Sequence, residues 1–131
     1  MFRRLTDIAP VTTSHGVGQK RVLLSSNESG CSLTQIAVTE LKAGEIAAAH
    51  VHPDMQEGFY VLDGELEIDL NGEKTTCCKD TFVYVEKCTS HEMRALTNSR
   101  IMTIGCVIEA SRNKLYPMLF KQNRKTLSQL M

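Results

Sequence analysis

Two histidines separated by a single residue, His50 and His52, are the feature of this sequence with the clearest chemistry. They lie in a strand-like stretch, where alternate side chains point to the same face, so both imidazoles are expected on one side of a sheet. Pro53 interrupts that stretch and Glu57 opens the next one, so a tight return brings a carboxylate back beside them. Two imidazoles and a carboxylate are a ligand set for a divalent metal such as Fe, Mn, Ni or Zn.

A third histidine, His91, opens a later strand-like stretch after the turn-rich residues 86–90, and it can supply a fourth ligand from across a barrel. Spacing alone leaves another interpretation open, because two alternating histidines on a strand are more often ordinary residues than metal ligands. Cys88 is close to His91 in sequence. It is interpreted as a buried or loop thiol rather than as a thiolate ligand.

Short alternating apolar runs must position these side chains, and they dominate from about residue 20 to residue 110. In residues 65–70, leucines and isoleucine alternate with acids, and Asn71-Gly72 then predicts a hairpin into residues 73–78 because both turn residues need positive φ. The other expected strands are residues 21–25, 32–41, 48–52, 58–62, 81–85, 91–97 and 101–108. Eight or nine short strands without an intervening helical pattern favour an antiparallel barrel or sandwich.

The C-terminal residues 111–131 have a different pattern. They hold five basic residues and no acid, whereas the other 110 residues carry 10 basic and 15 acidic residues, a net charge of −5. Leucines near helical spacing predict a short helix over about residues 117–129. A basic tail of this kind is expected to dock on the acidic body or on a second copy rather than on DNA.

The spacing around the paired histidines resembles the first signature of the cupin superfamily. Gly44, His50, His52, Glu57 and Gly64 match that signature at every fixed position and every gap. The second signature, Gly-Asp, then Pro-x-Gly, then His with Asn four positions later, is matched less well. Its departures here are Lys79 for the first Gly, Val85 or Glu86 for Pro, Lys87 or Cys88 for the second Gly, and Ala95 for Asn. Asp80 and His91 fit it.

The resemblance covers roughly residues 30–110 and implies a small all-β barrel, the double-stranded β-helix or jelly roll, with one metal in its mouth. It implies that His50, His52, Glu57 and His91 bind that metal. Such a set leaves one or two coordination positions open, which is typical of catalytic sites. The whole chain, 1–131, is then one domain with an N-terminal arm over residues 1–25, a core barrel and a basic helical tail.

Two function classes stay open on this evidence. The first is a metalloenzyme that acts on a small oxygen-rich molecule as an oxygenase, sugar isomerase or epimerase, lyase or decarboxylase. The second is a non-catalytic small-molecule binder on the same barrel. The resemblance also implies a homodimer.

Composition indicates which partners and which cellular compartment are expected for either function. Lysine and arginine balance aspartate and glutamate at 15 each, so no basic excess indicates a nucleic-acid partner. No apolar run is long enough to predict a membrane span. Five cysteines without CxxC spacing, and no apolar leader, predict a cytoplasmic protein with reduced thiols.

Three further segments are candidates for the pocket. Residues 15–18, His-Gly-Val-Gly, are interpreted as a flexible lid or arm from which His15 can reach the metal site, rather than as a phosphate loop. Phe82 and Tyr84 share one face of a strand, so one of them is a candidate pocket wall. Phe59 and Val61 share the parity of Glu57 and are expected to face the interior.

Overall fold

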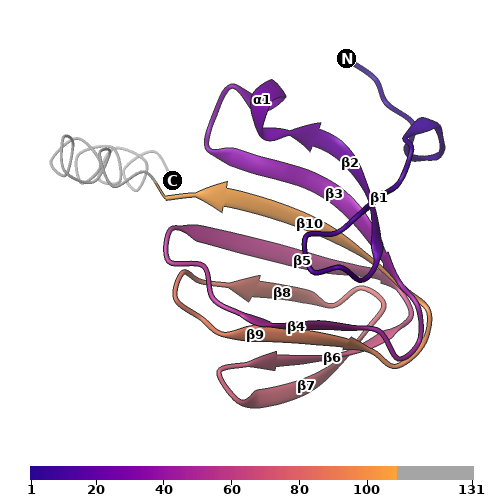
Figure 1. Ribbon diagram of the computed structural model, residues 1–131, viewed down its shortest axis with the longest axis vertical. Coiled ribbons are helices and arrows are strands. Elements are labelled where there is room, and N and C mark those ends of the chain that lie inside the picture. The colour runs from indigo at the N-terminus through magenta and orange to yellow at the C-terminus, as the bar shows by residue number, and fades with distance from the viewer. Residues whose placement is uncertain (109–131) are drawn as a thin grey trace, which may run out of the picture.

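The computed structural model describes residues 1–108, and Figure 1 shows a body built almost wholly of strands. Ten strands are present: β1 (Val11–Thr12), β2 (Gln19–Ser25), β3 (Leu33–Leu41), β4 (Ile46–His50), β5 (Met55–Asp63), β6 (Glu65–Leu70), β7 (Glu73–Cys78), β8 (Phe82–Val85), β9 (His91–Ala95) and β10 (Ser99–Val107). A 3₁₀ turn, η1 (Leu5–Asp7), and one turn of helix, α1 (Ser26–Ser29), complete the described elements. The helix expected over residues 117–129 lies outside the described residues.

The strands form two antiparallel sheets that face each other. The larger has the order β1-β2-β3-β10-β5-β8 and the smaller the order β4-β9-β6-β7. Every strand pairing is antiparallel, and consecutive strands repeatedly cross between the sheets, as the ribbon in Figure 1 shows. The all-β prediction is therefore confirmed for the part of the chain that the structure describes.

All nine strands expected from the sequence are present, two of them with the predicted bounds. The hairpin of β6 and β7 is joined by Asn71 and Gly72, whose φ angles of 51° and 89° are the positive values that the turn requires. The main difference is at β4, which starts two residues earlier than expected and ends at His50. Its pairing with β9 shifts register between Ala47 and His50, so His52 lies just beyond the strand.

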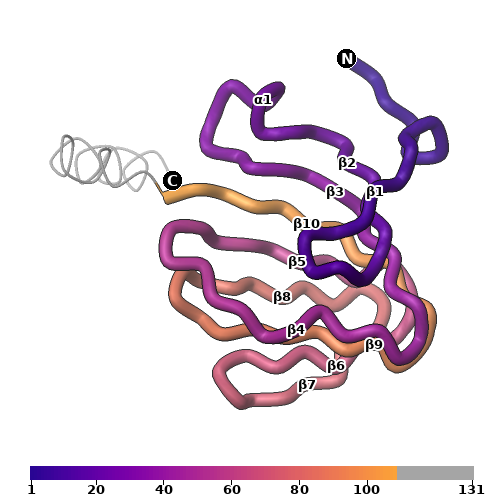
Figure 2. The backbone as a smooth tube through the Cα atoms, viewed as in Figure 1, coloured from indigo at the N-terminus to yellow at the C-terminus, as the bar shows by residue number. Residues whose placement is uncertain are grey.

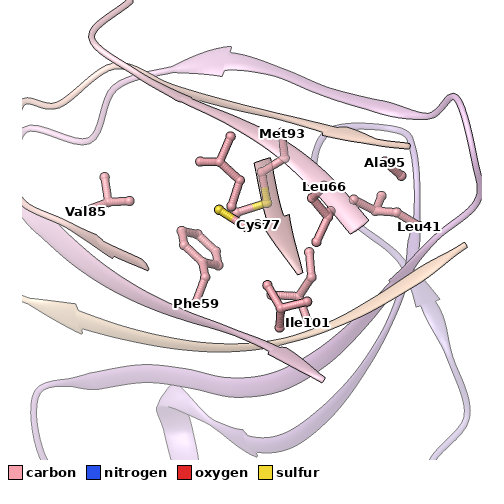
Figure 3. Packing of buried hydrophobic residues seen from close by; sticks show 10 residues of the cluster. Leu41, Phe59, Leu66, Cys77, Val85, Met93, Ala95 and Ile101 are labelled. Atoms are coloured by element: carbon pink, nitrogen blue, oxygen red, sulfur yellow. The ribbon is translucent and has the colours of Figure 1, made fainter. Parts of the chain in front are cut away.

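The inner faces of the two sheets enclose the apolar core (Figure 3). Phe59 and Val61 of β5 are 7% and 0% exposed, which confirms their expected inward direction beside Glu57. Leu66 and Ile68 of β6 pack against them from the smaller sheet. This apolar filling leaves one end of the space between the sheets for polar groups. Among residues 1–108, no helix has the length and apolar character needed to cross a bilayer.

Gly64 provides a test of the β5–β6 connection. Its φ of +87° is unfavourable for other residues, and an added Cβ would lie 2.2 Å from Ser99 Oγ and 2.5 Å from the Asn98 carbonyl oxygen. Gly64→Ala is therefore expected to lower the free energy of unfolding by about 2 kcal/mol or more, measured by urea denaturation. Gly72→Ala is the matched control, since its φ is +89° but nothing lies within 4 Å of the added Cβ. It is expected to cost only about 1 kcal/mol, and equal losses in the two variants would contradict the steric argument.

Candidate metal centre

Three histidines and one glutamate converge at the end of the barrel where β4 ends and β9 begins. His50 is the last residue of β4, His52 follows in the connection to β5, Glu57 lies in β5 and His91 is the first residue of β9. Each offers one ligand atom, and these four atoms all lie within 4.8 Å of one another. The structure thus brings together all four side chains that the sequence singled out.

The two sheets contribute different parts of this group. His50 and His91 are direct partners across β4 and β9 of the smaller sheet, with ring centroids 3.9 Å apart. Glu57 comes from the facing sheet, and its Oε1 lies 3.1 Å from His52 Nε2 and 3.4 Å from His91 Nε2. A cation placed among these atoms would join the two sheets through side chains.

The imidazoles of His50 and His91 are each oriented by a hydrogen bond to a nearby backbone carbonyl. His50 Nδ1 lies 2.9 Å from the carbonyl oxygen of Ala48, and His91 Nδ1 lies 3.0 Å from that of Thr89, each two residues earlier. A carbonyl can only accept, so each Nδ1 carries the proton and donates it. In a neutral ring this leaves Nε2 with a free lone pair, the arrangement that a metal-ligating histidine needs.

His52 is held through its backbone instead. The backbone N–H of Cys88 donates to the carbonyl oxygen of His52 at 2.8 Å. Cys88 makes this bond with a φ of 63°, in the left-handed region that favours glycine. The thiol itself is exposed, which agrees with its interpretation as a loop cysteine.

Burial and neighbouring charges shift the pKa values of Glu57, His91 and His50 in different directions. Burial disfavours the charged form of Glu57, but the nearby imidazoles of His91, His52 and His50 outweigh it and lower the pKa of this carboxyl. Burial likewise opposes protonation of His91, yet the Glu57 carboxylate and the Thr89 carbonyl raise its pKa. Burial lowers the pKa of His50. The group therefore centres on one buried carboxylate, with a strong local preference for a positive charge beside it.

Two buried atoms of this group have no hydrogen-bond partner. Among the described residues, Glu57 Oε1 and His91 Nε2 are the buried side-chain polar atoms left without a hydrogen bond. The 3.4 Å between them allows an ion pair only when His91 is protonated. Burying such atoms without a partner costs about 1–3 kcal/mol each, so structures rarely tolerate them without a reason. Both are strong ligand atoms for a divalent cation, and they face each other. The residues present therefore fit a metal ion in both donor chemistry and placement.

His15 also reaches this end of the barrel. Its ring centroid is 4.3 Å from that of His50, so the segment between β1 and β2 lies over the mouth, as the sequence suggested for a lid. Burial lowers the pKa of His15. Phe82 and Tyr84 instead lie on the outer face of β8, 60% and 51% exposed, so the structure does not place them in the pocket.

A cavity of about 90 Å³ opens beside the four side chains, and its walls include His15, His50 and Glu57. Lys20 and Gln35 line it too, and sequence reasoning missed both. Both are polar residues of strands whose side chains line the cavity, and a polar residue among inward-facing positions was the sequence signal that could have identified them. A larger cavity of about 510 Å³ lies where β3 and β5 end. It shares Val17 and Leu41 with the smaller one, and none of the four side chains lines it. Two of the four side chains that could hold a metal, His50 and Glu57, line the smaller one.

Comparison with protein families places this geometry in context. The family model described as a cupin domain matches residues 37–108, a range that includes all four side chains. Quercetin 2,3-dioxygenase of Bacillus subtilis (strain 168) is 26% identical over 101 residues, which are 77% of this chain and 30% of that protein. The tetracenomycin polyketide synthase protein TcmJ of Streptomyces glaucescens is 28% identical over 87 residues, 66% of this chain and 58% of that protein. This chain thus spans less than two thirds of either relative.

Several solved structures superpose on this chain and share its architecture. A crystal structure described as a predicted oxalate decarboxylase from Thermotoga maritima superposes with a TM-score of 0.77 at 20% identity, covering 82% of this chain and 100% of that chain. KdgF from Halomonas sp. gives a TM-score of 0.72 at 17% identity, covering 85% of this chain and 96% of that chain. The polyketide cyclase RemF from Streptomyces resistomycificus gives a TM-score of 0.69 at 14% identity, covering 83% of this chain and 81% of that chain. At these identities the likeness shows the fold alone.

Proposed function

This chain belongs to the cupin domain family, and on that premise we propose that it is a metal-dependent enzyme acting on a small oxygen-rich molecule. One divalent ion, Fe, Mn, Ni or Zn, is held by His50, His52, Glu57 and His91. The observation that carries the proposal is the facing pair of buried, unpartnered ligand atoms, Glu57 Oε1 and His91 Nε2. When bound, such an ion supplies Lewis-acid polarisation of an oxygen-bearing substrate or, if it is redox-active, a centre for oxygen chemistry.

The residues of the chain prepare the site for that chemistry. The carbonyls of Ala48 and Thr89 keep Nε2 of His50 and His91 aimed at the common centre. Glu57 contributes the negative charge that a divalent ion needs. Phe59, whose ring centroid lies 6.2 Å from that of His91, is an apolar neighbour of the site on its core side. Three imidazoles and one carboxylate leave coordination positions free for a substrate oxygen.

The relatives support an enzyme without naming its reaction. Their names include a dioxygenase, a polyketide synthase protein and a polyketide cyclase, so the shared barrel carries different chemistries. We propose a reaction of the oxygenase, sugar isomerase or epimerase, or lyase type. The alternative is a non-catalytic small-molecule binder, for which the same cavity would suffice.

A screen separates the two functions. The protein is loaded in parallel with Fe(II), Mn(II), Ni(II) and Zn(II), and incubated with sugar-derived acids and small phenolics under air and under nitrogen. An enzyme is expected to give a new product with at least one metal, detected by mass spectrometry, and none in the His50→Ala, His52→Ala double variant. Binding without product under every metal would support the binder instead.

We further propose that the protein is a homodimer. The outer face of the larger sheet presents a patch formed by Tyr60, Phe82, Tyr84 and Ile104, all 39–60% exposed, on the neighbouring strands β10, β5 and β8. A two-fold contact needs only one self-complementary patch of this kind. Light scattering at micromolar concentration is expected to give the mass of two chains, and a Phe82→Ser, Tyr84→Ser double variant the mass of one. A monomeric wild type would contradict the proposal.

A further inference from the structure

Lys20 is a charged side chain directed into the barrel. It lies in β2 opposite Thr39 of β3, and both residues line the cavity beside the metal centre. Its ammonium donates to Gln35 Oε1 at 3.1 Å, a neutral partner. None of the ion pairs among residues 1–108 involves Lys20. An inward-facing ammonium with only an amide beside it still has capacity to donate to an anion.

The charges around the cavity leave room for such an anion. Glu57 is the one acidic residue among the described cavity walls, and Lys20 the one lysine. Their charges cancel each other, so both positive charges of a divalent ion at the centre would stay uncompensated. A ligand that carries negative charge balances them, whereas a neutral ligand does not.

The segment between β1 and β2 forms one wall of this cavity, through Thr13, Ser14, His15 and Val17. In Figure 2 it is the indigo stretch that crosses the front of the molecule. The Gly18 N–H donates to Glu45 Oε2 at 2.8 Å, and the Thr13 N–H donates to the Gly18 carbonyl at 3.2 Å, so the base of the loop is fixed. Its tip places His15 against His50.

The cavity is small. Its volume of about 90 Å³ is well below the roughly 300–1,000 Å³ of pockets that take drug-sized ligands. It has space for on the order of three water molecules, or for an organic ligand of only a few non-hydrogen atoms. A bulky aromatic substrate fits only if the segment carrying His15 moves away.

We propose that this cavity binds a small carboxylate, such as a 2-oxo or 2-hydroxy acid. The carboxylate lies against Lys20, another oxygen of the ligand faces the metal centre, and His15 covers the ligand and excludes larger ones. This inference rests on the proposed metal site and adds to it a substrate class and two specificity-determining residues. It requires no chemical step, because it concerns binding alone.

The charge requirement is tested with Co(II)-loaded full-length protein, whose visible spectrum reports binding near the metal. Pyruvate is expected to bind more tightly than its neutral amide, pyruvamide. Lys20→Gln is expected to weaken pyruvate binding by about 10- to 100-fold and leave pyruvamide unchanged. Lys20→Arg, which keeps the charge, is expected to retain pyruvate binding within about threefold. If Lys20→Gln does not fold, the preference of the wild type for pyruvate over pyruvamide and the Lys20→Arg variant still decide the matter.

The covering role of His15 is tested with a larger ligand of the same class. Benzoylformate, a 2-oxo acid with a phenyl ring, is expected to bind weakly to the wild type and at least about tenfold more tightly to His15→Ala. Gln19→Ala is the control, because this exposed residue of the same hairpin bonds outward to Thr12. It is expected to behave as the wild type.

The outcomes distinguish this inference from the metal site beneath it. If the wild type binds Co(II) but does not distinguish pyruvate from pyruvamide, or if Lys20→Gln binds pyruvate as the wild type does, the carboxylate assignment is wrong while the metal site stands. If benzoylformate binds equally to wild type and His15→Ala, the covering role is wrong. If the wild type binds no Co(II), both the inference and the proposed function fail.

Discussion

The His50→Ala, His52→Ala double variant is expected to lose at least about tenfold in affinity for a divalent metal. The reason is the convergence of four ligand atoms within 4.8 Å, two of which the variant removes. Glu57 and His91 alone then offer two donors, too few to compete with water for the ion. Equilibrium dialysis of metal-free protein against Mn(II) or Zn(II) measures the loss.

The same variant is expected to stay folded, because the core of the barrel is apolar and separate from the metal centre. Circular dichroism checks this. Cys88→Ser is the matched control, since its thiol is exposed and its bond to His52 runs through the backbone. It is expected to bind metal as the wild type does. A loss in Cys88→Ser equal to that in the double variant would make the thiol a ligand and contradict the assignment.

The Leu66→Ala substitution is expected to have the largest effect on stability. Leu66 is 0% exposed and lies in β6 within the core cluster that joins the two sheets. Truncating a buried leucine removes apolar contacts and leaves a cavity, which costs about 2–5 kcal/mol. That is a large part of the roughly 5–15 kcal/mol by which a domain of this kind is stable. Urea denaturation monitored by circular dichroism measures the change.

Leu96→Ala is the control for the core, because Leu96 follows β9 and is 43% exposed. The same truncation there is expected to change the free energy of unfolding by no more than about 0.5 kcal/mol. If both leucine variants lost the same stability, burial would not explain the loss at Leu66.

Local patterns predicted much of this structure because they depend on near neighbours. Alternation in β6, the Asn71-Gly72 turn and the shared parity of Glu57 and Phe59 are properties of a few consecutive residues, and the structure confirms each. The convergence of His50, His52 and Glu57 was expected as well, although His52 lies just beyond β4 and not within the strand, as the parity argument assumed. His91 was added by its position at the start of a strand and by the resemblance to cupins.

The features that the sequence did not predict depend on contacts between segments distant in the chain. Lys20 appears in the sequence as one basic residue among 15, and only the pairing of β2 with β3 directs it into the barrel. His15 was suspected of reaching the pocket, but its contact with His50 requires the loop to fold back over a strand 35 residues later. Cys88, whose N–H donates to the His52 carbonyl, has a left-handed φ that cysteine does not favour and that local sequence patterns did not predict.

Elemental analysis of the purified wild-type protein is the decisive measurement for the metal site. About one divalent ion per chain is expected, retained after gel filtration and removed by a strong chelator. Metal-free protein is expected to take up the same amount again from a dilute solution of Fe(II), Mn(II), Ni(II) or Zn(II). If the wild type holds no divalent ion after exposure to each of these metals, or holds no more than the His50→Ala, His52→Ala variant, the assignment of the four side chains as a metal centre is wrong.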